Sequence, residues 1–381
     1  MTPPAASSRG VTALLTLVAL LLTAPVATPQ PVHDLTAALD AAVDRVFAEA
    51  GVPGAIVGLS IPGTVEYVRT LGEGDTAAKT PMSLDDHTRI GSVTKTFTGT
   101  AVLQLVDQGR IRLSDPISRY VDGVPSGGVV TLDMLGRMRS GLFNYTTDEQ
   151  FLDRYLEEGG QGPDAAAFTP RELVDIAFAH PLNFAPDTEF EYSNTNTVLL
   201  GMVIERVTGQ RLGDYLAQHV TGPLGLTHTS FPANGAMPQP YTHGYAETPD
   251  GEPVDTTLWN PSVAWAAGAM ISTYRDLRAW APAVARGALL LPWTHRERTA
   301  RPSEAAPGIG YMFALADFHG WIGHNGDIPG YQTVAVYLPE RDATLVVMVN
   351  SDVSESASTK LAEAVTTVAT PGNVYALPEP A

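Results

Sequence analysis

The 381-residue sequence contains no cysteine. This excludes disulfide bonds, cysteine nucleophiles and thiolate metal sites. The nine histidines are scattered and show no His-Glu-x-x-His pattern or other spacing typical of metal ligands. The sequence therefore predicts neither a metal site nor any other cofactor.

Positive charge is scarce, with 23 Lys and Arg residues against 41 Asp and Glu residues and a net charge of −18. A field of this sign repels nucleic acid and anionic membrane surfaces, so neither is expected as a partner. Lysine occurs only at Lys79, Lys95 and Lys360. Because a lysine can lose its proton and an arginine in effect cannot, Lys95 is a candidate for proton transfer.

Long apolar runs are rare, and one lies near the start of the chain over 11–24. Arg9 precedes this run and small residues follow it, an order typical of a secretory signal peptide, here residues 1–28. A membrane anchor is the alternative, although the run is short for spanning a bilayer. We expect a secreted protein with no stable membrane anchor after the signal is cleaved.

The remaining chain has the composition of an ordered globular protein. Apolar periodicity and turn residues predict two helices and four strands at the ends of the chain, over 33–50, 55–61, 64–71, 332–338, 343–349 and about 356–368. The middle is mostly helical, with a capping box at 169–172 and a helix over 198–207.

These elements predict an α+β or α/β fold, with an antiparallel sheet flanked by helices and a helical region inserted between the two parts of the sheet domain. The predicted domain covers 33–370. Its sheet lobe takes about 33–91 and 262–370, and its helical lobe takes about 92–261. A cleft between two such lobes is a common place for a site.

The first motif that could carry out catalysis is Ser92-Val93-Thr94-Lys95, which opens a helix predicted to run to about Gln108. Residues three apart on a helix are neighbours, so Ser92 and Lys95 point the same way. A neutral amine can deprotonate a serine, and free N–H groups at a helix N-terminus can hold an oxyanion. The alternative is a capping serine beside an exposed lysine.

Two further motifs lie far along the chain. Tyr192-Ser193-Asn194 combines a tyrosine able to relay protons with an asparagine able to grip an amide, although a polar helix-entry turn is the alternative. His324-Asn325-Gly326 follows the run over 318–322, and a strand edge that bears this histidine would line the cleft. The alternative there is a hairpin turn, for which Asn-Gly is a strong signal.

In order and separation, the three motifs resemble those of the serine penicillin-recognising family, which are Ser-x-x-Lys, Tyr-x-Asn or Ser-x-Asn, and Lys/His-x-Gly. The similarity covers about 35–365. Several stretches are similar to secreted actinomycete D-alanyl-D-alanine carboxypeptidases, namely 89–97, 103–107, 139–142, 192–196 and 262–265. The resemblance implies a β-lactamase/transpeptidase-like fold.

The resemblance also implies the catalytic roles. Ser92 is expected to be the acylated nucleophile, with Lys95 and Tyr192 sharing the role of general base. His324 stands where class C β-lactamases have a lysine, and it is expected to donate a hydrogen bond or a proton.

Four residues are expected to bind substrate by the same resemblance. Asn194 would orient the scissile amide or ester, and Trp265 would form part of the pocket wall. Asn325 would contact substrate. The backbone N–H groups of Ser92 and Asp327 would form the oxyanion hole.

The sequence departs from the carboxypeptidases in two respects. Those relatives bind a terminal carboxylate partly through an arginine that follows a Gly-x-Gly segment, here 308–310, but the matching position falls near Ala314 and no Arg or Lys lies between Arg301 and Arg341. The third motif also continues into Asp327, where the relatives have threonine. The hydrolytic machinery is therefore complete, whereas the carboxylate clamp is missing.

Three functions stay open. One is hydrolysis of a D-alanyl peptide, a β-lactam or a similar small molecule, with cell-wall peptidoglycan among the candidate partners. The second is a family esterase, or a D-amino-acid amidase or aminopeptidase, without carboxypeptidase specificity. The third is a penicillin-binding sensor with little turnover.

Overall fold

A computed structural model describes residues 32–155, 167–247, 251–354 and 356–377. The predicted signal segment, 1–28, lies outside these residues. No helix in the described part of the chain is long and apolar enough to cross a membrane.

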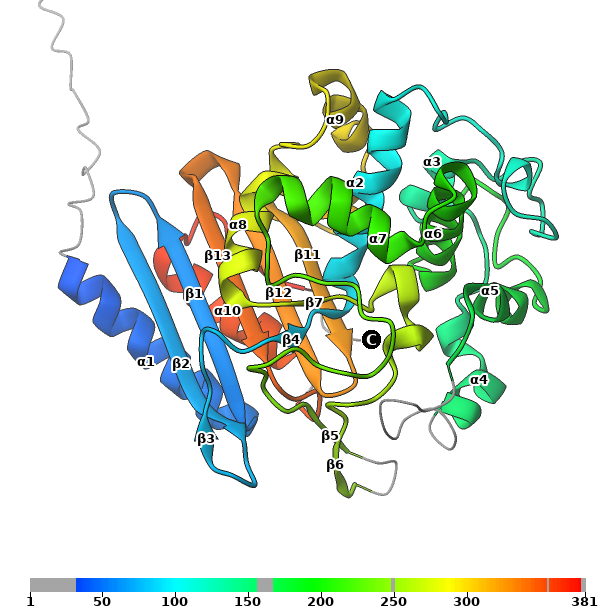
Figure 1. The fold of residues 1–381 in the computed structure, drawn as a ribbon. Coiled ribbons are helices and arrows are strands. Elements are labelled where there is room, and N and C mark those ends of the chain that lie inside the picture. The colour runs from blue at the N-terminus through cyan, green and yellow to red at the C-terminus, as the bar shows by residue number, and fades with distance from the viewer. Residues whose placement is uncertain (1–31, 156–166, 248–250, 355, 378–381) are drawn as a thin grey trace, which may run out of the picture. The chain divides into compact units, whose positions relative to one another are not determined.

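A nine-stranded sheet forms the centre of the fold (Figure 1), with the strand order β3-β2-β1-β13-β12-β11-β10-β9-β8. Every neighbouring pair is antiparallel. The first and last parts of the chain meet where β1 pairs with β13. The strands are β1 (Gly54–Ile61), β2 (Val65–Asp75), β3 (Thr80–Pro81), β8 (Ser303–Ala306), β9 (Ile309–Met312), β10 (Leu315–Phe318), β11 (Trp321–Ile328), β12 (Tyr331–Leu338) and β13 (Ala343–Val349).

The two faces of the sheet are covered by different helices. Alternate residues of β13 pack on α1 (Val32–Ala50) and α10 (Ala357–Ala369) on one face, as Leu345 and Val347 do. The residues between them, such as Val346, join the core around α8 (Tyr274–Ala285) on the other face. Because both faces are covered, the central strands are apolar at nearly every position.

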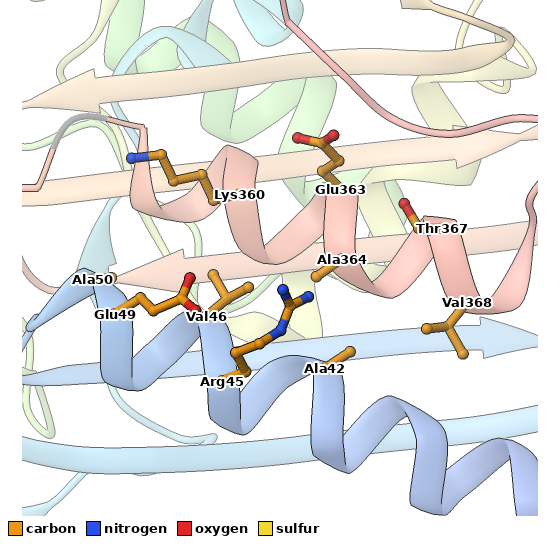
Figure 2. A pocket seen from close by; sticks show the side chains of 10 residues that line it. All are labelled: Ala42, Arg45, Val46, Glu49, Ala50, Lys360, Glu363, Ala364, Thr367 and Val368. Carbon is orange, nitrogen blue, oxygen red and sulfur yellow. The ribbon is translucent and has the colours of Figure 1, made fainter.

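A groove of about 360 Å³ remains between α1 and α10 on the first of these faces (Figure 2). Arg45 extends from α1 toward α10, and Glu363 and Lys360 stand along α10. None of the motif residues lines this groove.

The inserted middle of the chain is mainly helical and lies beside the sheet (Figure 1). A two-stranded ribbon of β4 (Thr88–Arg89) and β7 (Ile271–Ser272) connects it to the sheet region. The helices of this part are α2 (Thr94–Asp107), α3 (Leu132–Gly136), α4 (Glu149–Arg154), α5 (Pro170–Phe178), α6 (Asn194–Thr208) and α7 (Leu212–Leu216), and α9 (Pro292–Thr299) precedes the last strands.

Most of the predicted elements are confirmed, including the capping box of α5 at Thr169 and Glu172. The run over 318–322, which precedes the third motif, is divided between two strands. Phe318 ends β10, and Trp321 begins β11 after a turn in which His319 and Gly320 both have positive φ. Gly326 lies inside β11, so Asn325-Gly326 is not a hairpin turn.

Candidate active site

Ser92 lies in a short 3-10 helix, η1 (Gly91–Val93), which leads directly into α2. Gly91 has a φ of 48°, and a Cβ atom there would lie 2.7 Å from the backbone nitrogen of Asp327. A glycine is therefore required for η1 to approach β11 this closely. The side chain of Ser92 is partly exposed and thus open to a substrate.

Lys95 is completely buried one helical turn after the serine. Its Nζ lies 2.8 Å from Ser92 Oγ, 2.7 Å from Asn194 Oδ1 and 2.7 Å from the carbonyl oxygen of Ala267. The prediction that Ser92 and Lys95 face each other agrees with this geometry.

Burial lowers the pKa of Lys95 well below its ordinary value. A neutral amine has two N–H bonds and one lone pair. Asn194 Oδ1 and the Ala267 carbonyl can only accept, so they take the two N–H bonds. The lone pair of Lys95 then faces Ser92 Oγ–H, which is the arrangement a general base requires.

Tyr192 lies just before α6, with its ring centroid 4.9 Å from Lys95 Nζ. Its hydroxyl shares a hydrogen bond with Ser92, but removal from water dominates and raises the pKa of Tyr192. The phenol is therefore neutral at physiological pH. It can pass a proton between Ser92 and a leaving group while Lys95 acts as the base.

Asn194 is the first residue of α6, and three contacts fix it. Its backbone N–H donates to Asn144 Oδ1 at 3.0 Å, and its Nδ2 donates to Thr146 Oγ1 at 3.2 Å. With Nδ2 directed at Thr146, Oδ1 must face Lys95. The asparagine thus orients the lysine before it can meet any substrate.

The predicted oxyanion hole lies where β11 meets η1. In the described structure β11 pairs with β10 only through 321–323, so its second half has β12 on one side and no strand on the other. A Cβ atom on Gly326 would lie 2.2 Å from the Ile90 carbonyl oxygen and 2.7 Å from Ser92 N. The backbones of Ser92 and of the β11 strand are thus in close contact, which brings the N–H groups of Ser92 and Asp327 to the same small region.

His324 is buried, and both ring nitrogens have partners. Nδ1 lies 2.5 Å from the carbonyl oxygen of Asn325, and Nε2 lies 3.2 Å from the hydroxyl of Tyr311. Burial, followed by repulsion from the protonated form of Lys95, lowers the pKa of His324 to about 3. The imidazole is therefore neutral. His324 thus brings no positive charge to the position at which a lysine is expected in class C β-lactamases.

Trp265 does not face the catalytic serine. Its ring lies over Gly201 of α6, where a Cβ atom would lie 2.7 Å from it, and it also contacts Phe231. The indole lines a separate cavity of about 500 Å³ beside α5, α6 and α7. The backbone of this segment reaches the site instead, through the carbonyl of Ala267.

Asp327 places a carboxylate close enough to Tyr192 to contribute to the raised pKa of that phenol. Asp327 is exposed as a residue, yet the protein around its carboxyl group removes much of the water that would stabilise the charge. This desolvation, followed by the charge of Asp352, raises the pKa of Asp327 to about 6. The carboxyl group is therefore mostly ionised at neutral pH.

The structure also locates the residues expected near a carboxylate clamp. Ala314 is buried in the turn between β9 and β10 and packs against Gly99 of α2, so an arginine at this position would not reach the site. Arg298 is the buried cation of this region, and it donates to the carbonyls of Phe313, Ala314 and Thr96. It is held against α2, away from Ser92.

Four contributors to the site escaped sequence analysis: Asn144, Thr146, the Ala267 carbonyl and Tyr311. None belongs to a recognisable motif. Only Tyr311 carried a signal, because it directly follows the Gly308-Ile309-Gly310 segment. Among the described residues no cluster of His, Asp and Glu is suited to hold a metal ion.

A serine at a helix N-terminus, a buried lysine whose pKa is lowered and a tyrosine in contact with both form the site of a serine hydrolase. The chain belongs to the beta-lactamase family, whose model matches residues 39–369.

Curated relatives include Protein flp of Staphylococcus aureus, 26% identical over 335 residues. The match covers 84% of this chain and 64% of that protein, so the chain spans less than two thirds of the length of this relative. Esterase EstB of Burkholderia gladioli is 34% identical over 228 residues, covering 58% of this chain and 56% of the esterase.

Among solved structures, a D-stereospecific amidohydrolase from Streptomyces sp. is similar with a TM-score of 0.76 and 32% identity. The similarity covers 88% of this chain and 99% of that one. D-amino acid amidase from Ochrobactrum anthropi SV3, in complex with D-phenylalanine, gives a TM-score of 0.77 at 27% identity, covering 89% and 99%.

Proposed function

We propose that this protein hydrolyses amides of D-amino acids, and small esters, through an acyl-enzyme on Ser92. We further propose that its preferred substrates carry no free carboxylate beside the bond that is cleaved. The observation that carries this choice is the charge of the third motif, where His324 is neutral and Asp327 is anionic. The similar amidohydrolase, amidase and esterase support the same choice.

The proposed chemistry follows from the contacts around Ser92. Lys95 takes the proton of Ser92 as Oγ attacks the substrate carbonyl, and the N–H groups of Ser92 and Asp327 hold the resulting oxyanion. Tyr192 delivers its proton to the leaving amine or alkoxide and receives the proton that Lys95 took from Ser92, so Lys95 is neutral again. Water then attacks the acyl-enzyme with the same base, releasing the acid and restoring Ser92.

A terminal carboxylate would be poorly bound in this site. Two like charges about 4–6 Å apart repel each other by about 1–4 kcal/mol at the dielectric typical of a protein surface. Arg298 cannot offset this repulsion, because its guanidinium is committed to backbone carbonyls. Carboxypeptidase action is therefore the less favoured alternative, and a sensor with little turnover would not need the complete Ser92, Lys95 and Tyr192 arrangement.

The test is a pair of matched substrates, D-alanyl-D-alanine and D-alanyl-D-alanine amide. We expect kcat/KM at pH 7.5 to be at least about 10-fold higher for the amide, since 1.4 kcal/mol corresponds to a factor of ten. As the pH falls through about 6, Asp327 becomes protonated and the preference should narrow. A higher kcat/KM for the free acid would overturn the proposed selectivity.

The variant Asp327→Asn should reduce the preference for the amide at pH 7.5. Glu363→Gln is the matched control, because it removes one negative charge from α10 on the far face of the sheet (Figure 2). The control should leave the ratio unchanged. Mass spectrometry of the Ser92 adduct with a p-nitrophenyl ester measures acylation independently of this selectivity.

A further inference from the structure

Tyr311 on β9 contacts two residues of the site from behind. Its ring makes edge-to-face contacts with Tyr192 and His324, at centroid distances of 6.0 Å and 5.7 Å. Phe190 packs against the same ring at 5.8 Å. The Tyr311 side chain is buried, so it cannot itself contact a substrate.

The hydrogen bonds of His324 determine where its proton lies. The carbonyl oxygen of Asn325 can only accept, so the 2.5 Å contact requires the proton to be on Nδ1. The neutral ring then has a bare lone pair at Nε2, 3.2 Å from the Tyr311 hydroxyl. Burial raises the pKa of Tyr311 well above its ordinary value, so this phenol keeps its proton and donates it to Nε2.

His324 consequently has no N–H left to offer a substrate. Its occupied Nε2 is also unavailable to Tyr192, whose ring centroid lies 6.1 Å away. If Nε2 were free, it would be a buried acceptor competing with Ser92 for the hydroxyl of Tyr192.

From these contacts we infer that Tyr311 is a positioning residue, which fixes the Nδ1–H tautomer of His324 and thereby leaves the hydroxyl of Tyr192 directed at Ser92. The third-motif histidine then acts as a hydrogen-bonded support for Tyr192 and not as a proton donor to the leaving group. This role requires only acylation of Ser92 and holds whichever substrate class the enzyme prefers.

The direct test is the 15N NMR spectrum of the His324 ring in the full-length free enzyme, assigned through His324→Gln. We expect a protonated Nδ1 and an unprotonated, hydrogen-bonded Nε2. In Tyr311→Phe the Nε2 resonance should move toward that of an unbonded imidazole nitrogen. A protonated Nε2 in the native enzyme would overturn the inference, as would a spectrum unchanged by Tyr311→Phe.

The kinetic test measures the rate at which a fluorophosphonate acylates Ser92, together with kcat and KM for a p-nitrophenyl ester. Tyr311→Phe should lower the acylation rate and kcat on the order of 10-fold with little change in KM, because the ring remains and only the orientation of the site is disturbed. An unchanged acylation rate would contradict the positioning role.

A double-mutant cycle with His324→Gln separates positioning from general stability. If Tyr311 acts through His324, the double variant should lose no more activity than the more impaired single variant. Independent, multiplying losses would contradict the inference. Tyr331→Phe is the matched control, since it removes an equally buried hydroxyl that bonds the Thr242 carbonyl at 2.9 Å, and it should alter neither the His324 spectrum nor the acylation rate.

Discussion

At the scale of single residues, Lys95 combines complete burial with two contacts to oxygens that can only accept, so a neutral Lys95 keeps its lone pair for Ser92. Lys95→Arg should lose on the order of 100- to 10,000-fold in the acylation rate, because arginine keeps its proton and general-base catalysis contributes about this much. Burst kinetics with a p-nitrophenyl ester measure the loss. Lys79→Arg, at an exposed position, is the control, and near-native acylation by Lys95→Arg would remove the lysine from the mechanism.

Ser92 supports a second prediction at this scale. Ser92→Ala should abolish covalent labelling by a fluorescent penicillin or a fluorophosphonate, because no other hydroxyl is bonded to Lys95 Nζ in the described structure. Gel fluorescence and intact mass report the adduct. Full labelling of the alanine variant would show that the nucleophile lies elsewhere.

The ionisation of Asp327 should affect the stability of the folded protein. Its pKa is raised in the folded protein to about 6, from 3.8, so the folded state holds its proton more tightly than the unfolded state. Stability therefore declines as the pH rises from about 4 to 6, and the penalty persists above that range. We expect Asp327→Asn to raise Tm at pH 7.5 but not at pH 3.5, by scanning calorimetry. An equal shift at both values would mean that the carboxylate charge is not responsible.

At the scale of elements, the predicted oxyanion hole lies at the close contact between η1 and the free half of β11. Gly326→Ala would place a Cβ atom 2.2 Å from one backbone atom and 2.7 Å from another, and neither can move without displacing η1 or β11. We expect kcat to fall on the order of 100-fold, the loss typical of a disturbed oxyanion-hole donor. Gly128→Ala is the control, because a Cβ atom there meets nothing within 4 Å. Equal kcat in the two variants would contradict this account.

The elements that sequence analysis predicted well are those whose signal is local. The strands β1, β2, β12 and β13 have apolar runs bounded by turn residues, and α5 carries its own capping box. The start of α6 was placed four residues late, at 198 instead of Asn194, because the group that bonds its first N–H is Asn144, fifty residues earlier.

The difference between local signals and contacts from distant parts of the chain also applies to the site. Ser92 and Lys95 are one helical turn apart, so their contact could be predicted from spacing alone. The partners of His324 could not, since Tyr311 reaches it from β9 across the intervening β10 strand. Trp265 was expected in the pocket wall, but its backbone has a φ of 35°, and the space above Gly201 receives its ring. The packing of Trp265 depends on α6, and no local sequence pattern indicates that α6 lies next to the Trp265 segment.

At the scale of the whole molecule, the chain ends are joined: β1 pairs with β13, and α1 packs with α10 on one face of the sheet. The helical segment with Ser92 and Asn194 lies between these ends in sequence, and β11 belongs to the same sheet. Damage to α1 or α10 should therefore reach the catalytic site through the sheet, which is consistent with the described residues from Val32 onward forming a single compact unit.

We propose that the protein is exported, because an apolar run over 11–24 follows an arginine near the start of the chain. A secretory signal depends on an unbroken apolar segment. In a bacterial host, Leu20→Arg should therefore keep the protein inside the cell, whereas Leu20→Ile should leave export intact. Immunoblots of medium and cell fractions measure the distribution, and N-terminal sequencing of the exported protein should place its first residue near position 28. Export of the arginine variant at the native level would show that this segment is not the signal. Retention of the native protein in the membrane, with its N-terminus uncleaved, would instead favour an anchor.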